Sequence, residues 1–314
     1  MTQERVDSMP MDRGGLSTEA RNPRSMHLHT LDARACVELI AREDERVAAA
    51  VRAAGPEIAR FVEAAERGFQ RGGRLIYVGA GTSGRLGVLD ASEAPPTFQV
   101  EHGRIVGLIA GGDQALRRSS EGMEDDREGA AGELGSLSLT QDDAVLGIAS
   151  GGTTPYVLGA LGIAKRMAST CVTGLLTCAR VERPPDCDRL IVIDTGPEVL
   201  TGSTRMKAGT ATKMTLNAIS TTLMVRSGRV YENLMVDLRA TNDKLRDRAA
   251  RIVAELTGLS RAESFSLLDA CGGEVKTAVA SHRLGVNADA ARTRLAQAGG
   301  RLDAALEERK GMAW

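Results

Sequence analysis

The chain has 314 residues, a formal net charge of −1 and a sequence pI near 6.5. Charges this evenly balanced exclude the broad basic footprint of proteins that bind nucleic acids or anionic membranes. Hydrophobic residues make up 42% of the chain and aromatic residues only 3%, so we expect one large or two ordinary domains with cores of aliphatic side chains.

The sequence shows no signal-peptide pattern and no apolar run of the ~20 residues that a membrane span requires. Its five cysteines lack Cys-x-x-Cys spacing, which favours reduced thiols and a cytoplasmic location. Residues 1–26 are polar and show no periodicity, and we predict that they form a mobile leader.

Two helices are predicted ahead of the first strand. Apolar residues recur at helical spacing over residues 31–51, and Gly55-Pro56 then ends this helix and begins the next one. The second helix carries an apolar stripe over residues 58–69.

Five apolar runs without polar alternation predict strands that are covered on both faces, as in a parallel sheet. The runs lie at residues 75–78, 105–110, 144–149, 172–177 and 190–193. Helical or linking segments separate them, so we predict an α/β fold: a three-layer αβα sandwich with a five-stranded parallel sheet over residues 27–242, which include the two N-terminal helices. In residues 243–314, glycines punctuate short helical segments and Ser260-x-x-Glu263 forms a capping box, which indicates a small helical bundle.

The first predicted strand is followed by a glycine turn and a helix start. Gly79, Gly81 and Gly84 surround Thr82 and Ser83, an arrangement that aims backbone N–H groups at an anion. Gly-x-Gly-x-x-Gly is also the fingerprint of dinucleotide-binding proteins, which place an acidic residue at the end of the second strand to bind a ribose. The second strand here ends in two glycines, and the nearest acidic residues precede it or are better placed to cap the next helix.

Hydroxyl-and-glycine loops also follow the third and fifth predicted strands, at residues 150–154 and 201–204. Ligands of open α/β sheets bind beyond the carboxyl ends of the strands, so three such loops favour a sugar phosphate over a dinucleotide. The third loop leads toward a helix predicted over residues 210–225, and nearby cations could neutralise a phosphate or lie on the surface. The residues predicted to bind the substrate and its phosphate are Gly81, Thr82, Ser83, Ser150, Gly151, Thr153, Thr154, Ser203, Thr204 and Lys207.

Two groups of carboxylates are candidates for acid–base chemistry. Glu93 precedes two prolines, which predict irregular backbone suited to a carboxyl at a pocket edge; a solvated glutamate at a helix end is the simpler alternative. Glu121, Glu124 and Glu128 recur at helical spacing, for which an acidic outer face is the simplest interpretation. The sequence offers no Ser-His-Asp set, metal-ligand cluster or reactive cysteine context, so we expect neither a metal nor a cofactor.

Four segments carry a resemblance to a known family. They are residues 79–84, Leu-Asp-Ala-Ser-Glu-Ala-Pro-Pro-Thr-Phe at 89–98, Glu-Gly-Met-Glu-Asp at 121–125 and Gly-Ser-Thr-Arg-Met-Lys-Ala-Gly-Thr-Ala-Thr-Lys at 202–213. In this order and spacing they resemble the bacterial N-acetylmuramic acid 6-phosphate etherases, and the resemblance extends from residue 32 into the helical tail. One loop departs from the family, because residues 150–155 read Ser-Gly-Gly-Thr-Thr-Pro where Ala-Ser-Gly-Arg-Thr-Pro is common.

The resemblance implies a sugar isomerase (SIS) domain, a small helical C-terminal domain and a homodimer. It also implies cleavage of the D-lactyl ether of N-acetylmuramic acid 6-phosphate to N-acetylglucosamine 6-phosphate and D-lactate. Glu93 aligns with the general acid of the family, and Glu124 with its second active-site glutamate. In the open-chain sugar the aldehyde acidifies the C2 proton; its removal permits β-elimination of lactate, and water then adds at C3.

Two other functions stay open on the sequence. A regulatory protein of the same fold would sense a sugar phosphate without turnover, because fold alone does not fix function. An aldose–ketose isomerase would use the same proton abstraction without loss of lactate. The two glutamates favour the etherase over both.

Overall fold

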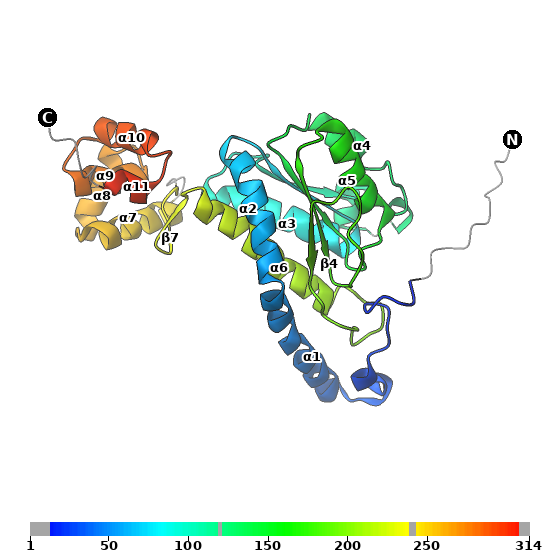
Figure 1. Cartoon of the computed structure of the whole chain (residues 1–314). Coiled ribbons are helices and arrows are strands. Elements are labelled where there is room, and N and C mark those ends of the chain that lie inside the picture. The colour runs from blue at the N-terminus through cyan, green and yellow to red at the C-terminus, as the bar shows by residue number, and fades with distance from the viewer. Residues whose placement is uncertain (1–12, 119–120, 239–242, 308–314) are drawn as a thin grey trace.

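The computed structural model describes residues 13–118, 121–238 and 243–307. They form an α/β body and a C-terminal group of helices (Figure 1). A parallel five-stranded sheet runs through the body in the order β2-β1-β3-β4-β5, which confirms the predicted sheet. Its strands are β1 (Leu75–Gly79), β2 (Ile105–Ile109), β3 (Ala144–Ile148), β4 (Val172–Thr177) and β5 (Arg189–Val192).

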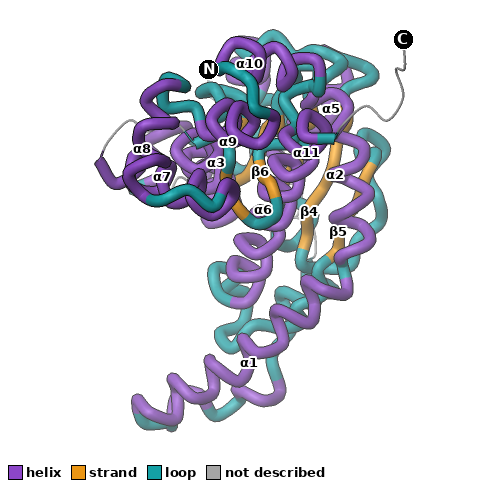
Figure 2. Tube along the Cα trace, turned by 90° about the vertical axis from the view of Figure 1, so that its left-hand side faces the viewer, coloured by secondary structure: helices purple, strands orange, loops and turns teal. Residues whose placement is uncertain are grey.

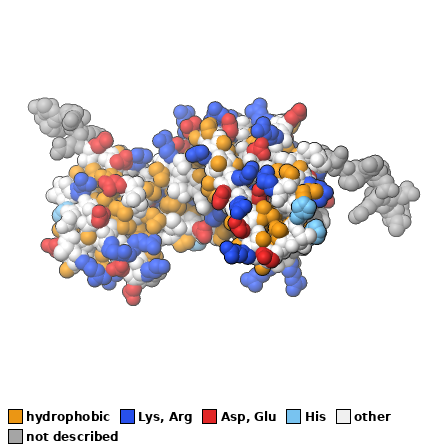
Figure 3. Space-filling view, turned by 90° about the horizontal axis from the view of Figure 1, so that it is seen from below, with side chains coloured by type: hydrophobic (Ala, Val, Ile, Leu, Met, Phe, Trp, Pro, Cys, Tyr) orange, Lys and Arg blue, Asp and Glu red, His pale blue; other side chains and the backbone are white. Residues whose placement is uncertain are grey.

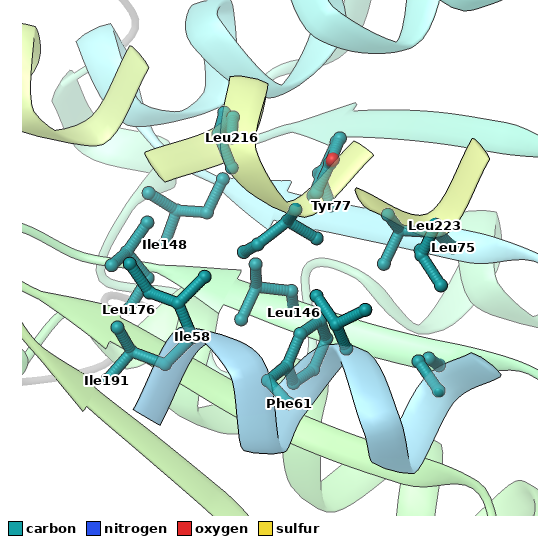
Figure 4. Close-up of a cluster of buried hydrophobic side chains, with 14 of the residues drawn as sticks. Ile58, Phe61, Leu75, Tyr77, Leu146, Ile148, Leu176, Ile191, Leu216 and Leu223 are labelled. Carbon is teal, nitrogen blue, oxygen red and sulfur yellow. The ribbon is translucent and has the colours of Figure 1, made fainter. Parts of the chain in front are cut away.

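Helices cover both faces of the sheet because the strands alternate their side chains between two apolar layers. In β1, Leu75 and Tyr77 face one layer, and Ile76 and Val78 face the other. Figure 4 shows the first layer, where side chains from two helices meet those of the central strands. The predicted three-layer sandwich is confirmed: α2 (Gly55–Gln70), α3 (Gly81–Phe98) and α6 (Lys207–Arg226) pack on the first face, and α4 (Ala131–Ser136) and α5 (Pro155–Met167) on the second.

The order of the strands marks one position in the sheet as a binding crevice. β1 and β3 are neighbours, although β2 lies between them in the sequence. The chain therefore leaves β1 toward one edge of the sheet and returns on its other side. Open α/β sheets of this order bind ligands at the carboxyl ends of the two strands where the order reverses. The loops that follow β1 and β3 begin at that position.

Part of the predicted leader is packed against the body, next to the long helix α1 (Ala33–Ala53), which extends beyond the sheet (Figure 2). Thr18 and Asn22 are buried, and Ser25 Oγ donates to the Val199 carbonyl at 2.7 Å. These contacts come from turns and polar side chains, which leave no apolar period in a sequence. The expectation of a mobile leader therefore does not describe residues 13–26, and residues 1–12 lie outside the described part of the chain.

The C-terminal region begins with a short hairpin, β6 (Val230–Tyr231) and β7 (Leu234–Met235). The helical bundle is confirmed, with its own apolar core: α7 (Asp243–Thr257), α8 (Arg261–Ala270), α9 (Val275–Leu284), α10 (Ala288–Gln297) and α11 (Leu302–Leu306). The capping box of Ser260 and Glu263 begins α8. The predicted domain limit at residue 242 falls outside the described residues. Within the described ranges, no helix is long and apolar enough to cross a bilayer.

Candidate active site

The turn from β1 into α3 presents the start of a helix that no side chain caps. Gly81 adopts φ = +53°, a conformation that favours glycine. Ala80, at the N-cap, offers no side-chain acceptor to the N–H groups of the first turn. Ser83 lies within this turn and is only 8% exposed. This is the geometry in which a helix start binds an anion.

The loop between β3 and α5 begins beside this turn, because Gly79 at the end of β1 is in register with Ile148 at the end of β3. Thr154 is the N-cap residue of α5, and its side chain makes no capping bond. The Tyr156 N–H donates instead to the Glu124 carbonyl, at 2.9 Å. Glu124 is therefore fixed at the start of α5, beside the second hydroxyl loop.

The segment that carries Glu124 is not an α-helix. A 3₁₀-helix, η4, covers only Glu121–Met123, and turns follow it. The Glu128 N–H donates to the Asp126 carboxylate at 2.9 Å, so a local turn replaces the helical ladder. The acidic helical face that the spacing of the glutamates suggested is therefore wrong.

The third hydroxyl loop leads into a helix start that the chain itself already caps. The Glu198 carboxylate accepts the N–H groups of Lys207 and Ala208, at 3.0 and 2.9 Å. Burial raises the pKa of Glu198, and the two backbone donors oppose that shift. Because α6 begins at Lys207 rather than at residue 210, these two donors are not available to an outside oxyanion. Ser203 and Thr204 precede them in the loop.

Lys207 takes part in a buried ion pair. Its Nζ lies 2.8 Å from Glu43 Oε2 of α1, and its side chain is 1% exposed. Glu43 also accepts hydrogen bonds from Arg24 and Asn22. Arg24 first, then Lys207 and Asn22, hold the pKa of Glu43 well below its usual range. The charge of Lys207 thus joins α6 to α1 and to the N-terminal residues instead of facing a phosphate.

The first and third loops come together, and their hydroxyls are available to a ligand. A methyl group added at Gly209, in the first turn of α6, would lie 3.5 Å from Thr82 Cγ2. On the face of the body that Figure 3 shows, acidic and basic side chains are interspersed. Within the described residues, no protein hydrogen bond engages the side-chain hydroxyls of Ser83, Ser150, Thr153, Thr154, Ser203 and Thr204.

Glu93 lies in a continuous helix, so the predicted irregular backbone is wrong. α3 continues through Pro95 and Pro96, which occupy its last turn. The helix ends at Gln99, which has φ = +52° and donates its N–H to the Pro95 carbonyl at 2.9 Å. A proline is least disruptive near a helix end, because few further turns depend on the hydrogen bond that it removes.

Lys213 of α6 connects Glu93 to a buried hydrogen-bond chain. Its Nζ lies 3.1 Å from Glu93 Oε2 and 3.6 Å from Asp90 Oδ1. Asp90 is 4% exposed and accepts hydrogen bonds from Tyr77 Oη at 2.9 Å and from Ser220 Oγ at 3.3 Å. Burial first, and then the Asp90 charge, raises the pKa of Tyr77, so its phenol stays a donor. This chain orients a Glu93 carboxyl that is itself 59% exposed.

Glu93 and Ser83 are far apart along the same helix. Ten residues separate them, or about 15 Å at the rise of an α-helix. An anion at the helix start lies before the first turn, which increases the separation. The path from phosphorus to C3 of a hexose 6-phosphate has five bonds and spans at most about 7 Å. This path is shorter than the separation of the two Cα atoms, so a sugar whose phosphate sits at Ser83 brings its C3 to Glu93 of the same chain only if the glutamate side chain extends back along the helix.

A cavity of about 580 Å³ lies away from these loops, between the C-terminal helices and residues just beyond α3. Its lining includes Arg229, Asp237 and Lys276. Asp237 pairs with both cations, so their charges are balanced within the chain. None of the predicted site residues lines this cavity.

Several residues that hold the site were not found from the sequence. Glu198 and Glu43 look like surface carboxylates there, because their partners come from separate segments. Asp90 did leave a signal: it precedes Glu93 by three residues, which places both on one side of a helix.

A family model and a solved structure are similar to parts of this chain. A family model of the glucokinase regulatory protein N-terminal SIS domain matches residues 57–165, which extend from α2 into α5. A solved structure of a protein from E. coli CFT073 is 18% identical and covers 65% of this chain and 97% of its own length. Its TM-score is 0.45, too low for the likeness to bear on fold or function.

Relatives of higher identity span nearly the whole chain. An N-acetylmuramic acid 6-phosphate etherase from Gloeobacter violaceus is 50% identical over 307 residues, which cover 98% of this chain and 100% of the relative. A protein of the same name from Salmonella agona is 50% identical over 299 residues, 95% of this chain and again 100% of the relative. The chain therefore belongs to the N-acetylmuramic acid 6-phosphate etherase family.

Proposed function

We propose that this protein cleaves the D-lactyl ether of N-acetylmuramic acid 6-phosphate, giving N-acetylglucosamine 6-phosphate and D-lactate. The observation that carries the proposal is 50% identity to etherases over nearly the whole chain. Both candidate glutamates and all three hydroxyl loops are present. The five cysteines are unpaired, which supports a reducing, cytoplasmic setting for this step of amino-sugar catabolism.

In this proposal the phosphate binds at the carboxyl ends of β1 and β3. The first-turn N–H groups of α3 and the Ser83 hydroxyl donate to it from one side. Ser150 or Thr153 donates from the neighbouring loop, and Ser203 from the loop before α6. The support is threefold: the first two loops begin at the reversal of strand order, Thr82 lies close to the start of α6, and these hydroxyls have no protein partner among the described residues.

The reaction proceeds by elimination and then hydration. A base removes the C2 proton of the open-chain sugar; the electron pair forms the C2–C3 double bond as the C3–O bond breaks. The departing oxygen takes a proton from a carboxylic acid and leaves as D-lactate. Water then adds at C3, loses a proton to that carboxylate, and C2 is reprotonated. The net change is hydrolysis of an ether, so acid–base groups suffice and we propose no cofactor or metal.

We assign protonation of the leaving lactate to Glu93. Lys213 orients this carboxyl from α6. Glu124 is the first candidate for the C2 proton, because the bond from Tyr156 holds it beside the second hydroxyl loop. Glu124 thus acts at C2 of the sugar, and Glu93 acts at the ether oxygen on the neighbouring C3.

A two-fold homodimer would reconcile these roles with the distance between Ser83 and Glu93. If Glu93 of each chain projects toward the loops of a second copy, both groups can face one sugar. Leu89 of α3 and Met214 of α6, next to Glu93 and Lys213, are 42% and 37% exposed. Exposed apolar side chains of this kind suit an isologous interface.

Mixed dimers test this arrangement. Glu93→Gln and Ser83→Ala each alter both sites of their own homodimer. A mixed dimer would contain one site with both defects and one with neither, so co-refolding equal amounts should give about a quarter of parent sites. At substrate concentrations below KM, activity should exceed the average of the two separate variants. Activity equal to that average, or a monomeric mass in solution, would contradict a shared site.

Release of D-lactate tests the function itself. The purified protein is incubated with N-acetylmuramic acid 6-phosphate, and D-lactate and N-acetylglucosamine 6-phosphate should appear in equal amounts. A sugar-phosphate sensor, which the match to a regulatory protein's domain favours, would bind the substrate without releasing lactate. An aldose–ketose isomerase would form a ketose that keeps the lactyl group.

A further inference from the structure

Residues 16–25, called here the strap, lie across two of the three hydroxyl loops. A methyl group added at Gly151, in the loop after β3, would lie 3.8 Å from Thr18 Oγ1. One added at Gly202, in the loop before α6, would lie 3.2 Å from Glu19 Oε2. The strap belongs to the dark blue segment that runs past the start of α6 in Figure 1. It therefore borders the proposed phosphate site.

The strap is fixed to the body and folded on itself. Asn22 Nδ2 donates to Glu43 Oε2 at 2.9 Å, and Ser25 Oγ donates to the Val199 carbonyl at 2.7 Å. Successive backbone turns close over residues 16–20. The hydroxyls in this stretch are therefore held in place before any ligand arrives.

Two of these hydroxyls are buried without a hydrogen bond. Thr18 is 0% exposed, and neither its Oγ1 nor Ser17 Oγ has a partner among the described residues. Burying a hydroxyl without a partner destabilises a fold, and valine would fill the same space as Thr18 without that penalty. An unpartnered hydroxyl here, close to Gly151, indicates a bond to a group that the described residues do not supply.

We propose that Thr18, with Ser17 beside it, donates hydrogen bonds to the phosphoryl oxygens of the sugar phosphate bound at the β3–α5 loop. The inference rests on the proposed function, which supplies that phosphate. The site then has three walls: the start of α3, the β3–α5 loop and the strap. Because the strap hydroxyls are already desolvated, binding an anion lets them form charge-assisted bonds without a further desolvation cost.

Two substitutions in the full-length protein separate this role from packing. Thr18→Val removes the hydroxyl and keeps the shape, whereas Thr18→Ser keeps the hydroxyl. Calorimetry gives the Kd for inorganic phosphate, and turnover gives KM and kcat for N-acetylmuramic acid 6-phosphate. We expect Thr18→Val to raise both Kd and KM about tenfold or more, and to change kcat by less than about twofold. For Thr18→Ser, both Kd and KM should stay within about threefold of the parent values.

The Tm of the unliganded protein provides a second readout. Thr18→Val should leave it unchanged or raise it, because an unpartnered buried hydroxyl is removed. Parent-like Kd and KM for this variant would overturn the inference, and so would a lowered Tm, which would make the hydroxyl structural. If inorganic phosphate binds too weakly for calorimetry, the KM of Thr18→Val relative to that of the parent decides the question. Failure of the proposed function looks different, because the unsubstituted protein would then release no D-lactate.

Discussion

Glu43→Ala should destabilise the protein severely, although it changes one carboxylate on a long helix that is otherwise largely solvent-exposed. Glu43 accepts hydrogen bonds from Arg24, Asn22 and Lys207, which join the N-terminal residues, α1 and α6. Its removal leaves the Lys207 ammonium, 1% exposed, without its counter-charge. Removing one partner of a buried ion pair costs about 3–5 kcal/mol, out of the roughly 5–15 kcal/mol that stabilise a typical fold.

Urea unfolding followed by circular dichroism measures this loss. Glu38→Ala is the matched control, because Glu38 is on the same helix and pairs with Arg42 in an exposed ion pair. It should cost no more than about 0.5 kcal/mol. Alanine favours the helix in both variants, so the difference reports the buried network. Glu43→Leu combined with Lys207→Met should recover most of the loss, because no unpaired buried charge remains. Equal losses from Glu43→Ala and Glu38→Ala would show that the network does not stabilise the fold.

Acid should weaken the same network. Bonds from Arg24 and its neighbours hold the pKa of Glu43 below its usual range in the folded protein, whereas in the unfolded chain it is about 4.3. The stabilisation is therefore fully present above the unfolded value and is lost as the pH falls toward the folded one. Between about pH 5 and pH 3 the unfolding free energy of the parent should decline more than that of Glu43→Gln. Equal declines of the unfolding free energy in the parent and in Glu43→Gln would contradict a role for Glu43 in this pH dependence.

Three further substitutions test the site. Glu93→Gln should bind the sugar phosphate like the parent but lose about 10²–10⁴-fold in turnover. If this variant still exchanges the C2 proton with solvent deuterium, the role of Glu93 is limited to protonating the leaving lactate. Lactate release at the parent rate would remove Glu93 from the mechanism. Ser83→Ala should raise KM by the equivalent of about 1–3 kcal/mol, whereas an unchanged KM would place the phosphate elsewhere. Gly159→Ala should lower both Tm and activity, because its methyl group would lie 1.8 Å from the Arg127 carbonyl oxygen, in the segment that carries the second candidate glutamate. Gly162→Ala, on the same helix, is the control, because its methyl group would meet only the end of the flexible Asp186 side chain, at 3.2 Å. Equal effects of the two alanines would show that the contact between Gly159 and Arg127 does not position the segment of the glutamate.

The sequence by itself determined the strands, the main helices and the first glycine turn. β1 reads as a continuous apolar run because helices cover both of its faces, and the stripe of α2 is visible because one face of that helix is buried. The glycine turn was equally predictable. A Cβ on Gly84 would lie 2.7 Å from the Gly79 carbonyl oxygen, so the close approach of strand and helix requires glycine there.

Only the tertiary structure decided which polar groups face a ligand and which face the chain. Lys207 looked available to a phosphate in the sequence, yet its ammonium is bonded to Glu43, 164 positions away. The third hydroxyl loop was predicted to bind the phosphate, yet Glu198 caps the helix start that follows this loop. Apolar burial repeats with the period of a helix or strand and so marks the sequence, whereas a single ion pair or cap between remote segments has no period. The burial of Thr18 beside the hydroxyl loop after β3 left no trace in the sequence for the same reason.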